Sequence, residues 1–236
     1  MEDIRAEQAT PTLRVFGGKG VFAFGTDAFL LAAYAREKAR GLANKRAVDL
    51  CAGTGIVGFL LMDACPTLAV SFVEINADAC ALCEKSVREN GFDARADVIR
   101  ADVKAVRSAL AAESADLVVC NPPYMTVSCG RMNAFDAKTV ARHEAACTIA
   151  DVFAACFYLL RTGGSAFFVY RSERIADLCE AARKSRFEIK DFCFVKTKER
   201  DDGVPLVLCR AVKGASVNAK VCVRDAAAIL KGLKEG

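Results

Sequence analysis

The sequence predicts an α/β fold in which apolar strands alternate with helices. The strand candidates are short apolar runs, as expected for strands buried on both faces of a parallel sheet. They are residues 46–50, 69–74, 115–120 and 165–170. Helical stretches separate these runs, and this alternation indicates βαβ units in a doubly wound sheet.

The helices carry their own start and stop signals. Thr26 and Asp27 can cap a helix that runs to about residue 40, and Asn76 can cap a second helix that ends at Gly91. Further helices are expected over residues 151–161 and 173–185.

The last two strand candidates, residues 187–197 and 204–212, are joined by too few residues for a crossover helix, so they are expected to pair antiparallel. The sheet is therefore expected to be mostly parallel and closed by an antiparallel hairpin. Residues 1–25 are expected to form an N-terminal cap and residues 216–236 a C-terminal tail. No linker marks a second domain.

The composition excludes several classes of protein. The chain has 236 residues, 53% of them apolar and 26% charged, which is typical of a globular domain. Its net charge of +4 permits a nucleic-acid partner without requiring one. No apolar run reaches the length of a membrane span, and the acidic N-terminus argues against a secretory signal.

The 12 cysteines are too sparse for a small disulfide scaffold, and most lie in apolar runs, which favours a reducing cytoplasm. No metal site is expected, because Cys80 and Cys83 form the only CxxC pair and His143 is the only histidine. Together with Val87, these two cysteines follow helical spacing, which favours core packing.

The first candidate site motif runs from Asp49 to Gly55 and joins a strand end to a helix start. Its small residues allow a backbone to approach a ligand closely. Cys51 stands where the dinucleotide fingerprint has its first glycine, and no lysine follows as in a phosphate-binding loop. A small side chain at position 51 is expected to be tolerable if φ is negative there, whereas a bulky one is not. On this motif alone, a plain strand-to-helix turn remains an alternative.

Two more acids are expected at the ends of neighbouring strands. Glu74 follows Asp49 by 25 residues, and a carboxylate there can bind both hydroxyls of a ribose. Asp102, followed by Val103, ends the next strand. Each acid alone could equally be a solvated strand-end charge, but three together suit a positively charged cofactor, which points to a sulfonium.

The fourth motif is Asn121-Pro122-Pro123-Tyr124. Proline fixes its own φ and restricts the residue before it, so Asn121 and the Pro122 carbonyl are expected to be held rigidly. Two fixed acceptors and a flat ring are what an exocyclic amine on a base needs. The rival interpretation is a rigid surface turn.

With these motifs the sequence resembles the class I S-adenosylmethionine-dependent methyltransferases of the NPPY type. More narrowly, it resembles the tRNA1(Val) (adenine(37)-N6)-methyltransferase family, through residues 24–31, 49–55, 121–124, 141–144, 159–164 and 171–175. The resemblance implies a Rossmann-like class I methyltransferase fold over residues 26–215, with a mostly parallel seven-stranded sheet and a C-terminal antiparallel hairpin.

The resemblance also implies a role for each site residue. Asn121, Pro122 and Tyr124 would be catalytic, holding the target amine and stacking on its base. Substrate contacts are expected from Pro123, Tyr124, Arg131 and Arg142, while His143 is a weaker candidate. The cofactor S-adenosylmethionine would be bound by Thr26, Asp27, Asp49, Cys51, Gly53, Gly55, Glu74, Ile75, Asp102, Val103 and Asn121.

The expected substrate is the N6 amine of an adenine in the anticodon loop of tRNA. Guanine N2 in ribosomal RNA and a protein glutamine amide remain alternatives within the same class of enzyme. A non-catalytic RNA- or partner-binding protein is the alternative from a different class. Most other basic residues alternate with acids, which indicates an ordinary solvated face. The sequence does not predict the oligomeric state.

Overall fold

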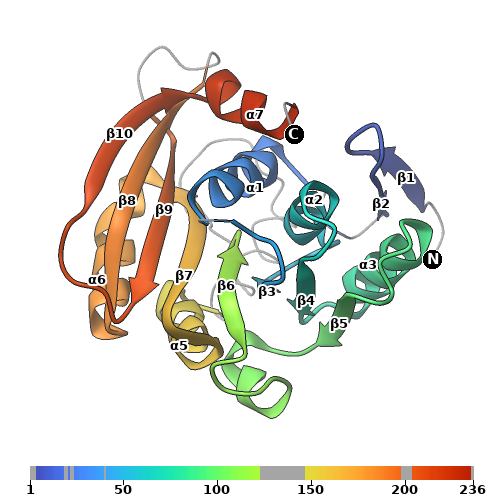
Figure 1. Cartoon of the computed structure of the whole chain (residues 1–236), viewed down its shortest axis with the longest axis horizontal. Coiled ribbons are helices and arrows are strands. Elements are labelled where there is room, and N and C mark those ends of the chain that lie inside the picture. The colour runs from blue at the N-terminus through green and yellow to red at the C-terminus, as the bar shows by residue number, and fades with distance from the viewer. Residues whose placement is uncertain are drawn as a thin grey trace, which may run out of the picture.

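A computed structural model describes residues 4–18, 21, 24–39, 41–122, 147–197 and 204–234. Figure 1 shows its strands and helices. The strands are β1 (Arg5–Gln8), β2 (Arg14–Gly17), β3 (Arg46–Leu50), β4 (Ala69–Glu74), β5 (Ala96–Arg100), β6 (Ala115–Cys120), β7 (Leu160–Arg171), β8 (Phe187–Lys196), β9 (Leu206–Lys213) and β10 (Lys220–Asp225). The α-helices are α1 (Thr26–Lys38), α2 (Ile56–Ala64), α3 (Ala77–Glu89), α5 (Ile149–Leu159), α6 (Ile175–Lys184) and α7 (Ala226–Lys234). The short 3₁₀ helices are η1 (Val103–Ser108) and η2 (Ser172–Arg174).

The central sheet has the order β10-β8-β9-β7-β6-β3-β4-β5. The strands from β5 to β7 pair in parallel, and β9 pairs antiparallel with both β7 and β8. This confirms the predicted α/β class, the mostly parallel sheet and the C-terminal hairpin. None of the helices in the described residues has both the length and the apolarity to cross a membrane.

The predicted strand count of seven is one too low, because β10 adds an eighth strand to the sheet. This strand lies in the segment expected to be a tail and pairs in parallel with β8. Its residues are mostly exposed, so it lacks the continuous apolar pattern that identified the buried strands. The helix α7 follows it and packs on α1, where the Arg36 guanidinium donates to the Gly232 carbonyl. Arg224 of β10 also forms a 2.6 Å ion pair with Glu37 of α1.

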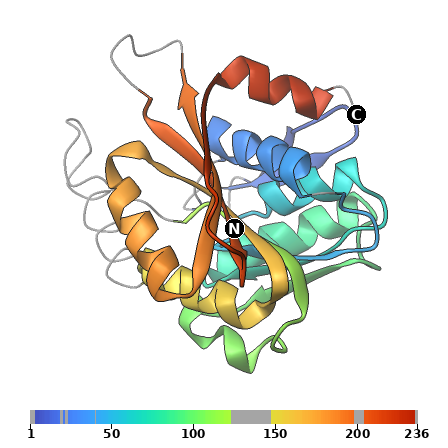
Figure 2. The same ribbon diagram turned by 60° about the vertical axis from the view of Figure 1, so that its left-hand side comes forward.

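Helices cover both faces of the sheet. Side chains of one strand point alternately to opposite faces, so Leu117 and Val119 pack with α1, α2 and α7, while Val118 and Cys120 pack with α5 and α6. Figure 2 shows these two helical layers on either side of the strands. The sheet is therefore buried on both faces over its middle strands, as the apolar runs predict.

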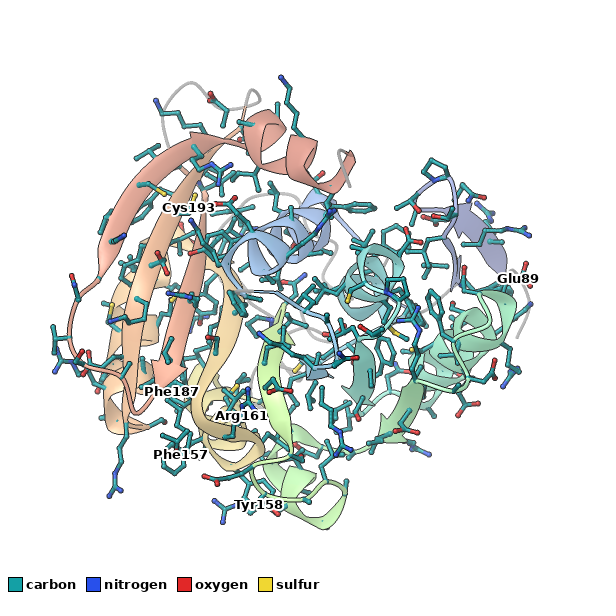
Figure 3. All side chains as sticks on the ribbon, in the orientation of Figure 1. Glu89, Phe157, Tyr158, Arg161, Phe187 and Cys193 are labelled. Atoms are coloured by element: carbon teal, nitrogen blue, oxygen red, sulfur yellow. The ribbon has the colours of Figure 1, made fainter. Side chains whose placement is uncertain are left out.

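Aromatic contacts fasten α5 to the strands beneath it. The Phe153 ring lies 4.7 Å from the Phe168 ring of β7 and 5.4 Å from the Phe187 ring of β8. Phe157 also meets Phe187 edge to face, with ring centroids 6.3 Å apart (Figure 3). These ring contacts pack α5, the first described helix after Asn121 and Pro122, against β7 and β8.

The start of α3 confirms the predicted cap. The Asn76 side-chain oxygen accepts hydrogen bonds from the backbone N–H groups of Asp78 and Ala79, at 2.9 and 3.1 Å. Cys80 and Cys83 are buried in the core, as expected for packing residues. Helix α1 differs from the prediction, because it begins at Thr26 itself and neither predicted cap residue is its N-cap.

The N-terminal strands β1 and β2 form a separate antiparallel hairpin that rests on α3. The Phe16 N–H donates to Ser86 Oγ at 3.0 Å, and Arg14 forms a 2.8 Å ion pair with Glu89, labelled in Figure 3. This hairpin lies beside the half of the sheet that carries β4 and β5. The division into a cap, a catalytic domain and a tail stays a prediction.

Candidate active site

The carboxyl ends of four parallel strands bring the predicted acids and Asn121 to one edge of the sheet. Asp49 lies in β3, Glu74 ends β4, Asp102 follows β5 and Asn121 follows β6. These strands are neighbours in the order β6-β3-β4-β5. Ligands of open α/β sheets bind at this edge, near the point where the strand order reverses.

Asp49 supports the site from below. Its side chain is only 1% exposed, and its Oδ2 accepts a 2.8 Å hydrogen bond from the Gly58 N–H in α2. Burial raises the pKa of Asp49 to about 7, the Gly58 hydrogen bond opposes the shift, and the charge of Glu74 adds to it. The carboxylate thus fixes the start of α2 beneath the turn.

The turn after β3 contains three residues with left-handed backbone conformations. The φ angles are +56° at Cys51, +57° at Gly53 and +88° at Gly55. The backbone at Cys51 therefore does not meet the condition of a negative φ under which a small side chain was expected to be tolerable there. Cys51 adopts a conformation that favours glycine, because the chain must reverse there between β3 and α2.

The two glycines of this turn are needed for different reasons. A Cβ atom at Gly53 would meet nothing within 4 Å, so this glycine leaves open space above the turn. A Cβ atom at Gly55 would lie 2.7 Å from Cys83 Sγ and 2.7 Å from the Phe59 ring. Gly55 is thus required by core packing, and Gly53 is the position with room for a ligand.

Glu74 joins two loops. Its Oε2 accepts a hydrogen bond from the Gly53 N–H at 2.8 Å, and its Oε1 accepts from the N–H groups of Ile75 and Asn76, each at 2.9 Å. The carboxylate is therefore held in one orientation at the end of β4. Each carboxylate oxygen has about two acceptor sites, so Oε1 is fully used and Oε2 keeps one site for a ligand hydroxyl.

The next two predicted residues differ in exposure. The Ile75 side chain is 49% exposed at the end of β4, so an apolar surface is available there. Asp102 caps η1, where its Oδ1 accepts from the Lys104 N–H at 2.9 Å. Val103 is buried in the core, so it supports this wall from behind.

Asn121 lies opposite the first turn of α1. Its Nδ2 donates to Asp27 Oδ2 at 3.4 Å, although the two residues are 94 positions apart in the chain. Its Oδ1 is buried, and no donor in the described part of the chain reaches it. Pro122 is buried beside it. Sequence reasoning had named both Asp27 and Asn121, but it gave no signal that they meet.

A group of thiols lies beneath the turn. Cys51 and Cys147 pack against the buried cluster that contains Cys120, and nothing in the sequence connects Cys147 with the site. The neighbouring Cys120 thiol and burial raise the pKa of Cys51, and burial raises the pKa of Cys120 to about 11. Thiols with raised pKa values stay protonated and are poor nucleophiles.

Only one of the remaining predicted site residues lies in the described part of the chain. Thr26 is exposed at the start of α1. Five others lie outside the described residues, namely Pro123, Tyr124, Arg131, Arg142 and His143.

The left-handed conformation of Cys51 leads to a first prediction. Cys51→Val should lower the free energy of unfolding by about 2 kcal/mol, because a β-branched side chain is strained at positive φ. Cys51→Gly should stay within about 1 kcal/mol of the wild type, since relief of strain offsets the lost thiol contacts. Urea unfolding of both variants measures the difference, and equal stability of the two would contradict it.

The buried carboxyl of Asp49 leads to a second prediction. The folded protein keeps a proton up to about pH 7 that the unfolded chain releases near its ordinary value of 3.8. The contribution of Asp49 to the free energy of unfolding therefore falls as the pH rises from 3.8 to about 7. The fall amounts to at most about 1.4 kcal/mol for each pH unit.

Asp49→Asn removes this titration and keeps an oxygen for the Gly58 N–H. Its free energy of unfolding, relative to the wild type, should therefore rise between pH 4.5 and pH 7.5. Urea unfolding across this range tests the trend. A constant difference at all pH values would show that the Asp49 carboxyl titrates normally.

Comparison with known proteins gives relatives at modest sequence identity. The chain is 29% identical over 157 residues to the tRNA1(Val) (adenine(37)-N6)-methyltransferase of Porphyromonas gingivalis, covering 65% of the chain and 60% of that relative. The relative of the same name from Pseudoalteromonas translucida is 23% identical, with 85% and 82% covered. The ribosomal protein uL3 glutamine methyltransferase of Bordetella pertussis is 33% identical over 106 residues, with 45% and 33% covered.

Solved structures share the fold. A predicted O-methyltransferase from Agrobacterium tumefaciens superposes with a TM-score of 0.63 at 23% identity, covering 84% of this chain and 85% of that one. TrmN from Thermus thermophilus gives a TM-score of 0.56 at 18% identity, covering 77% and 48%. The family model of the methyltransferase small domain matches residues 13–176. Since this match spans more than half of the sequence, the chain belongs to the methyltransferase small domain family.

Proposed function

We propose that this chain is an S-adenosylmethionine-dependent N-methyltransferase that modifies the exocyclic N6 amine of an adenine in the anticodon loop of tRNA. The observation that carries the proposal is the buried Oδ1 of Asn121, an acceptor without a donor in the described part of the chain. An amine with two protons needs two acceptors, and the carbonyl of Pro122 is the second one.

The described residues also fit the cofactor. A sulfonium nucleoside carries a positive charge, a ribose and an adenine ring. Glu74 keeps one site on Oε2 to accept from a ribose hydroxyl, Ile75 offers an exposed apolar face to the ring, and Gly53 leaves space above the turn. Asp102 would accept from the amine of the cofactor's adenine. When bound, this cofactor supplies an electrophilic methyl group.

Methyl transfer to this amine depends more on how the reacting atoms are positioned than on acid–base catalysis. The N6 lone pair is delocalised into the adenine ring, so this amine is a poor nucleophile. Acceptors on both protons favour a pyramidal nitrogen and stabilise the positive charge that develops on it. In-line placement of the nitrogen against the methyl group then supplies most of the acceleration. A base within folded RNA must first be turned outward, where Tyr124 can stack on it.

Two relatives support adenine in tRNA as the target, since both are named for that reaction. The glutamine methyltransferase relative favours a second candidate, transfer to a protein glutamine amide. An amide nitrogen also has two protons and a delocalised lone pair, so the same acceptor pair would serve it. Guanine N2 in ribosomal RNA has the same chemistry.

The deciding experiment is methyl transfer from labelled S-adenosylmethionine to unmodified total tRNA, followed by mass spectrometry of the nucleosides. We expect new N6-methyladenosine. Label in no nucleoside, despite binding of the cofactor, would reject tRNA as the substrate. Ribosomal RNA and glutamine-containing peptides would then be tested in the same assay.

Asn121→Ala provides the third prediction. The rate of transfer should fall at least about 100-fold, as for loss of one group that stabilises charge in a transition state. The Kd for the cofactor, measured by calorimetry, should change by less than about twofold, a difference below 0.5 kcal/mol. A parallel loss of cofactor binding and transfer would contradict the role of Asn121.

A further inference from the structure

The contact between Asn121 and Asp27 fixes which end of the amide faces the active site. An ionised carboxylate only accepts hydrogen bonds, whereas an amide has a donating nitrogen and an accepting oxygen. The Asn121 nitrogen therefore faces Asp27, at 3.4 Å from its Oδ2, and the oxygen points the other way. Rotating the amide by half a turn would put two acceptors against each other with no proton between them.

The Asp27 carboxylate is itself held by the backbone of α1. Its Oδ1 accepts from the Ala28 N–H at 3.0 Å. It also lies above Gly25, where an added Cβ atom would be only 2.8 Å from Asp27 Oδ1. The position in the first turn of α1 stabilises a negative charge as well. The carboxylate is therefore anchored to the backbone of its own helix and accepts from the Asn121 amide through Oδ2.

We propose that Asp27 is a positioning residue, which orients the Asn121 amide so that Oδ1 faces the target amine. This inference rests on the proposed transfer to an exocyclic amine. It gives Asp27 a role distinct from the one that the family resemblance implies, which is to close the methionine end of the cofactor site. The two roles differ in what they predict for cofactor binding.

The test exchanges the two side chains, with Asp27→Asn, Asn121→Asp and the double variant. In Asp27→Asn the new amide can bond to either end of Asn121, so orientation is lost. Transfer at saturating RNA and cofactor should fall about 10- to 100-fold, as for a misplaced reacting group. The Kd for the cofactor should stay within about twofold of the wild type.

Asn121→Asp places two carboxylates face to face. It should abolish transfer and lower the Tm by roughly 5 °C near pH 8, an effect of one to two kcal/mol in a domain of this size. In the double variant the amide at position 27 donates to the carboxylate at position 121. The Tm should return to near that of the wild type, and transfer should recover at least about tenfold over Asn121→Asp.

The proposal is overturned if Asp27→Asn keeps the wild-type rate, if it loses cofactor binding, or if the double variant is no more stable than Asn121→Asp. The thermal measurements use no RNA. If the wild type methylates no tRNA, the proposed function fails, while the recovery of Tm in the double variant still tests the contact. Circular dichroism of each variant confirms that the compared proteins are folded.

Discussion

The arrangement of the site depends on one carboxylate, that of Glu74. Its two oxygens accept three backbone N–H groups, one from the turn after β3 and two from the start of α3. The bonds to Ile75 and Asn76 are local and orient the carboxylate, whereas the bond to the Gly53 N–H joins it to the other loop. The carboxylate therefore holds the turn after β3 against the end of β4, at the place where a nucleoside cofactor would bind.

The three acids near this edge of the sheet differ in how deeply they are buried. Asp49 lies fully beneath the turn, where burial favours its protonated form, whereas Glu74 and Asp102 lie nearer to the surface at the strand ends. Two acids side by side would repel each other if both were ionised in a buried position. Below about pH 7 the Asp49 carboxyl is mostly neutral, so it adds no buried charge beneath the acids at the strand ends. A cationic cofactor favours the negative charge of those acids.

The sequence predicts which polar side chains lie at the strand ends of the site. Parallel strands that follow one another in a βαβ pattern must bring their carboxyl ends to the same edge of the sheet. That rule is sufficient to place Asp49, Glu74, Asp102 and Asn121 at one edge. It does not predict the contact between Asp27 and Asn121, which depends on how α1 packs against the sheet. The positive φ of Cys51 is set by the path of the turn rather than by the residue type. β10 escapes prediction because an exposed edge strand lacks a buried apolar run.

The packing of α7 on α1 has a consequence for the order in which the protein can be assembled. Helix α1 is synthesised well before its partner α7, since eight strands and four α-helices lie between them in the chain. Contacts between distant parts of a chain form late and slow down folding. Part of the surface of α1 must therefore stay uncovered until α7 has been synthesised. The helix that presents Asp27 becomes fully supported only when α7 is free to fold back onto it.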